Sequence, residues 1–301
     1  MSLSAVPAGP GPRPRAIPRR AAPVAPAAGV LTADRAAAIL GAVAEGPFTL
    51  EVPIMSSSRI GGATLVALLL LTVAGAGPAG AQYGDIADLK VAKPGDKEDV
   101  RAVPPPPGAI VLFDGSDLDR WISVDGKSPA PWKLADGGAA QVGGGGIMTR
   151  AKFDGHFKLH VEFRVPYLPA ASGQGRGNSG VYLQGRYEVQ ILDSYGLESQ
   201  DNDCGGIYKV AKPLVNACKA PTVWQSYDID FHAPVFKDGT KVEPARISVL
   251  QNGVPIHEDV KIPIDNTVSG LGGDPSTPGP IHLQDHGNPV QYRNIWLQPV
   301  K

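Results

Sequence analysis

Acidic, amide and aromatic side chains alternate with apolar ones in one short segment of the chain, Gly177–Ser194 (GNSGVYLQGRYEVQILDS). The alternation predicts two strands joined by a tight turn at Gly185, with apolar residues on one face and polar residues on the other. Tyr182 then lies near Glu188 across the hairpin. Such a face suits a sugar, because hydroxyl groups need donors and acceptors and sugar C–H faces stack on rings. We therefore expect Glu188 to be the principal acid of a sugar site.

A second acid of this segment, Asp193, is separated from Glu188 by an odd spacing. A regular strand sends such residues to opposite faces, so only a β-bulge between them brings both carboxylates to one side. In that case they act as acid and base, or as acid and nucleophile, at a glycosidic bond. The alternative is that both are solvated strand residues and that Asp193-Ser194 forms a turn cap.

Further polar side chains gather in Gly279–Trp296 (GPIHLQDHGNPVQYRNIW). His282, Gln284 and His286 recur at period two and therefore share one face of an extended chain. A face of this kind binds a metal ion or a sugar, or it is a hydrogen-bonded surface feature without a ligand. From the two segments together, the residues predicted to contact a sugar are Asn178, Tyr182, Gln184, Gln190, Gln284 and Arg293.

These segments belong to a region of short alternating runs separated by Gly, Asp, Asn and Pro, which is typical of an all-β sandwich or barrel. In Phe157–Val165 (FKLHVEFRV) the apolar and polar residues alternate throughout, and Asn252-Gly253 is a strong hairpin signal. Helices are not expected here. Strands are predicted at residues 109–113, 139–142, 157–165, 179–183, 187–192, 226–232, 246–251, 254–260, 280–284 and 292–299.

The N-terminal residues have a different character. Residues 1–54 are dominated by Ala, Pro, Gly and Arg, and the recurring Pro removes backbone donors and blocks helices, apart from a short predicted helix at Thr32–Val43. We expect residues 1–54 to be an upstream in-frame extension that is not translated or is disordered. Residues 55–81 have the order of a signal peptide, with Arg59, an apolar run and an A-x-A site ending at Ala81.

The expected organisation follows from this order. Residues 55–81 are the signal peptide, residues 82–107 are a linker ending in a polyproline run, and residues 108–301 are the working domain. The mature protein is then secreted or periplasmic. The alternative is a membrane anchor, although the apolar run is shorter than the roughly 20 residues that span a bilayer.

The charge and cysteine content of the chain indicate which binding partners and which cysteine chemistry to expect. The chain has 28 Lys and Arg against 29 Asp and Glu, so nucleic acid and, after signal cleavage, membranes are not expected partners. Cys204 and Cys218 lie in one loop-like segment without accompanying zinc ligands, which favours a disulfide in an oxidising compartment over a redox or zinc site. Closing this short loop would stabilise the fold by about 3 kcal/mol.

Four ordered motifs resemble a known family. FKLHVEFRVP, GNSGVYLQGRYEVQILDS, CGGIYKVAKP with APTVWQSYDI, and GPIHLQDHGNPVQYRNIWLQP are similar to the 3-keto-disaccharide hydrolase domain, formerly a domain of unknown function. The opening LFDGSDLDRW fits as well, and the resemblance covers Gly108 to Lys301. It implies a concanavalin A-like jelly roll of two antiparallel sheets, of the lectin and glucanase type.

The resemblance also implies an enzyme that acts on glycosides whose C3 hydroxyl is already a ketone, supplied by an upstream sugar 3-dehydrogenase. The ketone acidifies the C2 hydrogen, so a base can remove it and the C1 oxygen can leave by elimination before water adds. On this hypothesis Glu188 is the base. His286, or a divalent metal held by His282 and Glu162, polarises the ketone, and Asp193 or His286 protonates the leaving oxygen. No other cofactor is expected.

Glu188-Val-Gln-Ile-Leu-Asp193 is also similar to the E-x-D-x-x-E strand of laminarinase-type glycosidases on the same fold. It departs at Gln190, which carries no charge, and at Asp193, which is shorter than Glu. These departures disfavour a normal retaining mechanism. A laminarinase-type endo-glucanase and a non-catalytic carbohydrate-binding module remain the alternative functions.

Overall fold

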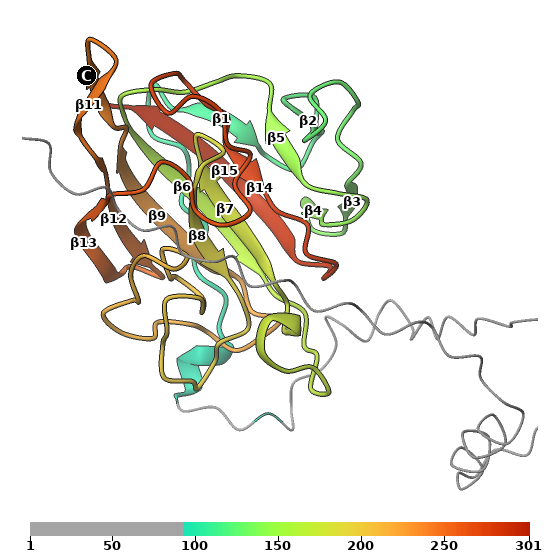
Figure 1. Ribbon diagram of the computed structural model, residues 1–301. Helices are drawn as coiled ribbons and strands as arrows, with labels where there is room; N and C mark the ends of the chain where they lie inside the picture. The colour runs from blue at the N-terminus through green and yellow to red at the C-terminus, as the bar shows by residue number, and fades with distance from the viewer. Residues whose placement is uncertain (1–88, 90–92) are drawn as a thin grey trace, which may run out of the picture. The chain divides into compact units, whose positions relative to one another are not determined.

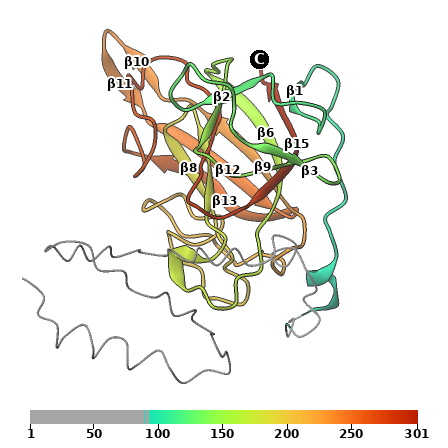
Figure 2. The same ribbon diagram turned by 90° about the vertical axis from the view of Figure 1, so that its right-hand side faces the viewer.

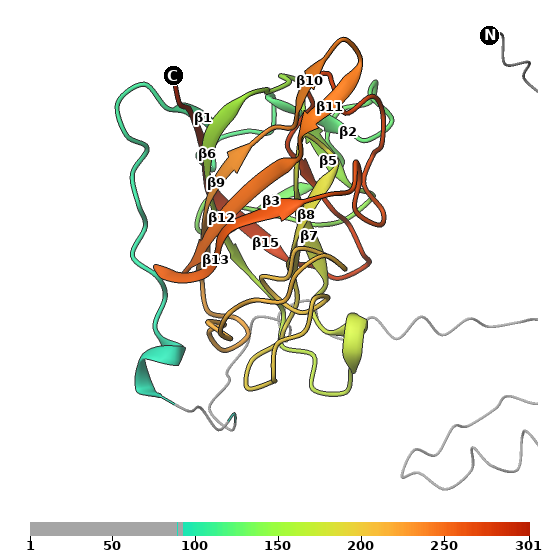
Figure 3. The same cartoon turned by 60° about the vertical axis from the view of Figure 1, so that its left-hand side comes forward.

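The larger of two packed antiparallel sheets contains most of the strands of the protein (Figure 1). This computed structural model describes residue 89 and residues 93–301. In the larger sheet the order is β13 (Val254–Ile262), β12 (Ala245–Gln251), β9 (Gln225–His232), β6 (His156–Arg164), β15 (Gln291–Pro299), β4 (Ala139–Gln141) and β3 (Lys133–Ala135), and β1 (Ile110–Phe113) also pairs with β15. The strands β13, β12, β9 and β6 lie side by side in Figure 3.

The smaller sheet carries the segments that the sequence singled out. Its order is β2 (Trp121–Ser123), β5 (Ile147–Thr149), β14 (His282–Leu283), β7 (Ser179–Leu183) and β8 (Tyr187–Ile191). A separate hairpin consists of β10 (Val235–Lys237) and β11 (Thr240–Glu243), and the helical turns among the described residues are η2 (Pro94–Lys97) and η3 (Gly173–Gly175). The predicted all-β sandwich of two antiparallel sheets is confirmed.

The core lies between the two sheets and follows the predicted alternation. Leu159, Val161 and Phe163 of β6 are fully buried in one cluster with Val181 of β7 and Val189 of β8. Because successive side chains of a strand point to opposite faces, the intervening polar residues of β6, β7 and β8 lie on the outer faces of the sandwich.

Two hairpins form where glycine supports positive φ. Asn252 and Gly253 have φ of 55° and 79° and connect β12 to β13, as predicted. Gln184 and Gly185 have φ of 53° and 67° at the turn between β7 and β8. The pairing of Val181 with Val189 fixes this register and places Tyr182 directly opposite Glu188.

Every predicted strand region contains an observed strand, with ends that differ by a few residues. The segment predicted at 280–284 is reduced to the two residues of β14. The sequence missed β2, β3, β5, β10 and β11, which are too short to show alternation.

Residues 82–107, predicted to be a linker, are bound to the sandwich over their described part. Asp96 accepts a hydrogen bond from the Tyr195 hydroxyl at 2.8 Å, and the Val103 carbonyl accepts one from Trp296 Nε1 at 3.1 Å. Figure 2 shows the segment running along one side of the sandwich. Residues 93–107 are therefore an attached segment and not a free spacer, because their backbone and side-chain groups pair with the domain.

The predictions for the N-terminal residues lie outside the described part of the chain. These are the extension 1–54, the helix Thr32–Val43 and the signal peptide 55–81. Among the residues that the structure describes, no helix has the length and apolar character needed to cross a membrane.

Cys204 and Cys218 are free thiols in the structure, so the predicted disulfide is not formed here. Both are buried, and Gln251 Nε2 lies 3.5 Å from each sulfur. The Cys204 and Cys218 side chains also contact each other, and Cys204 Sγ lies 3.1 Å from the Tyr227 hydroxyl. Since the pair is adjacent, a disulfide in an oxidising compartment stays a prediction.

Candidate functional site

Glu188 lies on the outer face of the smaller sheet, where two loops cover it. The backbone of β8 is hydrogen-bonded along its free edge, since Tyr208 N donates to the Glu188 carbonyl at 3.2 Å and Glu188 N donates to Thr267 Oγ1 at 3.1 Å. These loop contacts explain why Glu188 is only 2% exposed although its side chain points away from the core. The Glu188 carboxyl group is therefore largely shielded from water.

The Glu188 carboxyl group is positioned by β7. It hydrogen-bonds the Tyr182 hydroxyl on the opposing strand, and its Oε1 occupies the space that a side chain at Gly180 would fill. Burial raises the pKa of Glu188 to about 8, although the hydrogen bond from Tyr182 lowers it in part. A carboxyl group whose pKa lies near neutrality is suited to proton transfer.

A small cavity of about 40 Å³ opens beside this carboxyl group. Five of the predicted site residues line it, which confirms that the two sequence segments meet in space: Asn178, Glu188, Gln190, Gln284 and His286. Its other lining residues are Gln174, Tyr208, Val268 and Ser269. Of the described residues that line the cavity, Glu188 is the one with a carboxyl group.

Amide groups form a network on one side of the cavity. Gln174 Oε1 accepts hydrogen bonds from Gln190 Nε2 at 2.9 Å and from Asn178 Nδ2 at 3.1 Å. Gln284 Nε2 donates to the Tyr182 hydroxyl at 2.9 Å. Asn178 Oδ1 is buried and has no hydrogen-bond partner in the structure. A buried acceptor of this kind is costly unless a ligand satisfies it, which favours a polar ligand in the cavity.

His282 lies behind Tyr182 rather than in the cavity. Its ring stacks on the Tyr182 ring, with centroids 4.6 Å apart. Burial lowers the pKa of His282 to about 4, so the imidazole is neutral at physiological pH. In this arrangement His282 supports the Tyr182 ring, whose hydroxyl hydrogen-bonds Glu188.

Asp193 does not reach the cavity. The regular alternation of β8 ends after Ile191, since Ile191 and Leu192 both enter the core. Asp193 Oδ2 then accepts a hydrogen bond from Arg176 Nη2 at 2.8 Å in an ion pair. The strand is therefore irregular between Glu188 and Asp193, as a shared site for the two carboxylates would require. However, the irregularity turns Asp193 toward Arg176 and not toward Glu188.

Gln184 was predicted to contact a sugar, and the structure contradicts this. It lies in the turn between β7 and β8, where Nε2 donates to the Phe153 carbonyl and to Asp154 Oδ1, each at 3.1 Å. The period of two that places Tyr182 on the outer face ends at Leu183, because the chain turns at the next residue.

Glu162 and Arg293 lie on the other sheet, so their predicted roles with Glu188 are wrong. Arg293 Nε donates to Glu162 Oε2 at 2.6 Å and Asn294 Nδ2 to Glu162 Oε1 at 2.7 Å. Burial opposes ionisation of Glu162, but these bonds and one from His160 lower its pKa to about 2. Since Glu162 is on β6 and His282 on β14, the sandwich core separates them and they cannot hold one metal ion.

Four cavity residues were not predicted from the sequence. Gln174 lies in η3, Tyr208 in the loop after β8, and Val268 and Ser269 in the loop before β14. Loops show no periodicity that assigns a side chain to a face. The one available signal was that Tyr208 belongs to the CGGIYKVAKP motif.

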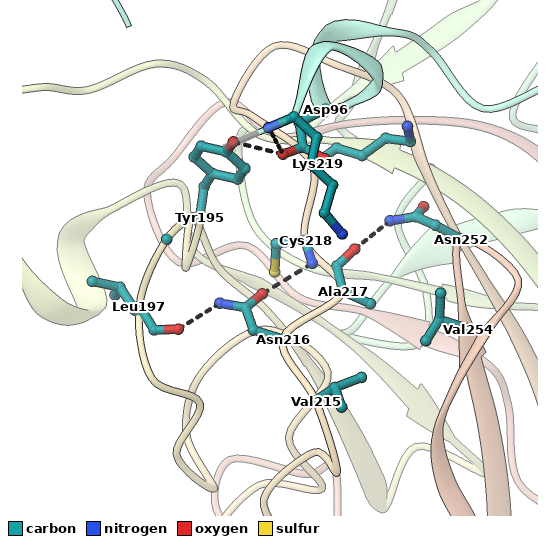
Figure 4. A pocket seen from close by; sticks show the side chains of 12 residues that line it. Asp96, Tyr195, Leu197, Val215, Asn216, Ala217, Cys218, Lys219, Asn252 and Val254 are labelled. Atoms are coloured by element: carbon teal, nitrogen blue, oxygen red, sulfur yellow. Dashed lines mark hydrogen bonds between the residues drawn. The ribbon is translucent and has the colours of Figure 1, made fainter. Parts of the chain in front are cut away.

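A larger cavity of about 560 Å³ lies elsewhere, among loops near Cys218 (Figure 4). Its acid, Asp96, already accepts hydrogen bonds from the Tyr195 hydroxyl and from Lys93 N at 3.0 Å. Figure 4 also shows Asn216 and Asn252 bonded to neighbouring backbone groups. The polar groups there hold loops together, whereas the small cavity combines a carboxyl group of raised pKa with amides, and it is the better site for chemistry.

The sandwich domain as a whole is similar to known proteins. Residues 108–298 match the family described as the 3-keto-alpha-glucoside-1,2-lyase-like domain. A crystal structure from Parabacteroides distasonis ATCC 8503, provisionally described as a glycosyl hydrolase, has 40% sequence identity and a TM-score of 0.58, covering 65% of this chain and 85% of that chain.

Two further solved structures are less similar. Another provisionally described glycosyl hydrolase of the same organism has 19% identity and a TM-score of 0.45, covering 64% of this chain and 95% of its own. The carbohydrate binding module CBM66 from Bacillus subtilis has 13% identity and a TM-score of 0.34, covering 63% of this chain and 99% of its own. A comparison with curated proteins finds no match.

Proposed function

This chain belongs to the 3-keto-alpha-glucoside-1,2-lyase-like family, and from that premise we propose that it cleaves glycosides whose C3 hydroxyl has been oxidised to a ketone. Membership of this family identifies the chain as a carbohydrate-active protein. The finer proposal rests on the cavity in which, among the described residues that line it, Glu188 alone has a carboxyl group, with a pKa raised to about 8.

In the proposed reaction Glu188 takes the C2 proton. The electron pair of that C–H bond delocalises onto the C3 oxygen, and then forms the C1=C2 bond as the C3 ketone is restored and the C1–O bond breaks. The leaving oxygen receives a proton, for which His286 at the open side of the cavity is the candidate donor. Water then adds at C1 while a proton returns to C2, so the net reaction is hydrolysis.

The surrounding groups support these roles. The pKa of Tyr182 is raised by burial and by the neighbouring Glu188, so its hydroxyl stays protonated and orients the carboxyl group. Asn178, Gln190 and Gln284 offer amide groups to the sugar and to the charge that develops on the C3 oxygen. No step requires a second carboxylate. A retaining or inverting glucanase does require one, which favours elimination over the endo-glucanase alternative.

Access for a sugar depends on the loop that covers the cavity. Ligand pockets of roughly 300–1,000 Å³ are usual, whereas this one is about 40 Å³. Val268, on the covering loop, is 59% exposed, so its side chain is not held in the core, although Thr267 and Leu271 on either side are hydrogen-bonded to Arg186 and Gly185. We propose that the loop at Val268 and Ser269 moves outward to admit the substrate.

The pH dependence is the first expected consequence. Only the ionised carboxylate can remove a proton, so kcat/KM should rise with pH through an apparent pKa of about 8. At pH 7 roughly a tenth of the free enzyme is then in the active form. Initial rates at subsaturating substrate across this range measure the value. Because removal of the C2 proton precedes protonation of the leaving oxygen, the proton donor does not enter this profile when the first step limits the rate; a profile that then falls as pH rises through 8 would exclude Glu188 as the base.

Asp193→Asn is expected to affect stability and not chemistry. The change removes the charge that pairs with Arg176, and should lower the free energy of unfolding by about 1–3 kcal/mol. Because Asp193 does not line the cavity, kcat should stay close to that of the unchanged protein. Urea denaturation and steady-state kinetics test the two parts separately. A large loss of kcat in a folded variant would return Asp193 to the catalytic site.

The proposed function is tested with a matched pair of substrates, a glucoside disaccharide and the same disaccharide oxidised at C3. Release of the C1 substituent from the keto sugar alone is expected. Since 3-keto-glycosides can also eliminate without enzyme, heat-inactivated protein is the control. Cleavage of the unoxidised disaccharide alone would favour the endo-glucanase, and binding without cleavage of either would favour a carbohydrate-binding module.

Two further parts of the proposal concern context. The substrate chemistry requires an oxidoreductase that converts a C3 hydroxyl to a ketone, which is the expected upstream partner. Export to the periplasm or beyond rests on the signal-like order of residues 55–81.

A further inference from the structure

We infer that the outer face of the larger sheet carries a binding site for a divalent transition metal ion, formed by His156, Asp230 and His232. His156 is the first residue of β6, and the other two lie at the end of β9. The two strands are antiparallel neighbours, and His156 is directly opposite His232. Alternation along β9 puts Asp230 on the same face as His232.

The donor atoms of the three side chains lie close together. His156 Nε2 lies 2.7 Å from Asp230 Oδ1, and His232 Nε2 lies 3.5 Å from the same oxygen. The two imidazole rings stack with centroids 3.8 Å apart and 19° between their planes, so for both to bind one ion the half-exposed His232 ring must rotate out of the stack and turn its Nε2 toward the ion. One donor atom from each residue falls within 4.8 Å of the other two.

These spacings fit a tetrahedral ion. With metal–ligand distances near 2.0–2.1 Å, two ligands of a tetrahedral Zn²⁺ are about 3.3 Å apart, close to the 3.5 Å between His232 Nε2 and Asp230 Oδ1, whereas the 2.7 Å contact of His156 is a hydrogen bond that the ion would replace. Two imidazoles and a carboxylate select transition metals over Mg²⁺ and Ca²⁺, which prefer oxygen ligands. Each side chain is between 29% and 37% exposed, so an ion has access and water can complete its coordination.

The charged groups around His156, Asp230 and His232 are compatible with a bound cation. Lys158 Nζ lies 3.8 Å from Asp230 Oδ2, the carboxylate oxygen turned away from the histidines. Arg246, which pairs with His232 in the sheet, is bound through Nη1 to Asp259 at 3.2 Å. Glu243 lines a cavity of about 200 Å³ beside the two histidines and supplies a further negative charge. A bound ion would therefore lie near Lys158 and Arg246, whose charges are already paired with carboxylates, and near one further carboxylate, that of Glu243.

The site is independent of the proposed catalytic cavity. It lies on the outer face of the larger sheet, whereas Glu188 lies on the outer face of the smaller sheet, with the core between them. The ion is therefore no part of the proposed elimination, and its binding can be measured without any substrate. The expected effect of the ion is to hold the ends of β6 and β9 together, which raises the melting temperature.

The test is calorimetric titration of the full chain, without a histidine tag and freed of metal by a chelator, with ZnCl₂ at neutral pH. We expect one ion per chain and a rise in melting temperature. His232→Ala should weaken binding by about 100-fold or more, and Asp230→Asn, which keeps the shape of the side chain, should also weaken it. Circular dichroism confirms that both variants are folded.

Matched controls separate this site from others. His286→Ala removes an exposed histidine in the loop after β14, and Cys204→Ser removes one buried thiol, and neither should change the affinity. MgCl₂ should not compete with zinc. Absence of zinc binding by the unchanged protein, or equal affinity in folded His232→Ala, would overturn the inference.

Discussion

Replacing Glu188 by glutamine is expected to lower kcat on a 3-keto-glucoside by about 10²- to 10⁴-fold, the usual contribution of a general base. Glutamine keeps the shape of the side chain and its contacts with Tyr182 and Gly180, but it cannot take a proton. Binding should persist, because the amides of the cavity are unchanged. Single-turnover rates and equilibrium binding of the keto sugar measure the two effects separately.

The same variant should be more stable than the unchanged protein at alkaline pH. The pKa of Glu188 is 4.5 in an unfolded chain and about 8 in the fold, so the folded state favours the protonated form. This contribution is fully present below pH 4.5 and is lost as pH rises through about 8, at a cost on the order of a few kcal/mol. Glutamine never ionises and avoids the cost. Equal stability of both proteins near pH 9 would contradict the raised pKa.

Gly180→Ala is expected to produce the second large loss of activity. A Cβ at this position would meet Glu188 Oε1 and lie 3.0 Å from Tyr182 Cε2. The carboxyl group lies at the end of a side chain with rotatable bonds, so it can move aside and the fold should survive. A displacement of about 1 Å at a reacting group can cost roughly 10²-fold in rate. We expect a loss of that size in kcat, with a melting temperature close to that of the unchanged protein.

Gly143→Ala is the matched control, because a Cβ there meets nothing within 4 Å and the residue has no positive φ. It should leave kcat unchanged. Full activity of Gly180→Ala would show that the position of the Glu188 carboxyl group does not matter for the reaction. A broad loss of stability in Gly180→Ala, without a specific loss of rate in the folded fraction, would point to the same conclusion.

Alternation and turn chemistry predicted much of the fold and of the site. The period of two in β7 and β8 placed Tyr182 opposite Glu188, because each strand has one apolar face that must enter the core. The same reasoning brought Gln284 and His286 to the cavity. The hairpin prediction succeeded because hairpin register depends on residues that are close together in the sequence, whereas Gln284 and His286 reach the cavity because β14 pairs with β7, a contact between distant parts of the chain.

The failed predictions depended on contacts between distant parts of the chain. Alternation places Glu162 and His282 on polar faces, but it does not report that these faces belong to different sheets. Likewise, the sequence raised the possibility of a break in the alternation of β8 after Ile191. The ion pair between Asp193 and Arg176 could not be predicted, because it depends on the loop around η3. The loop residues Gln174, Tyr208 and Ser269 were missed because loops show no periodicity.

The central claim is that Glu188 removes the C2 proton of a 3-keto sugar. Its most direct test replaces the C2 hydrogen of the keto substrate by deuterium and compares kcat/KM for the two substrates, with the fate of the label followed by mass spectrometry. Elimination predicts a primary isotope effect and early loss of the label from C2 in the product. Equal rates for the two substrates, with the label retained at C2 in the cleaved sugar, would contradict the account.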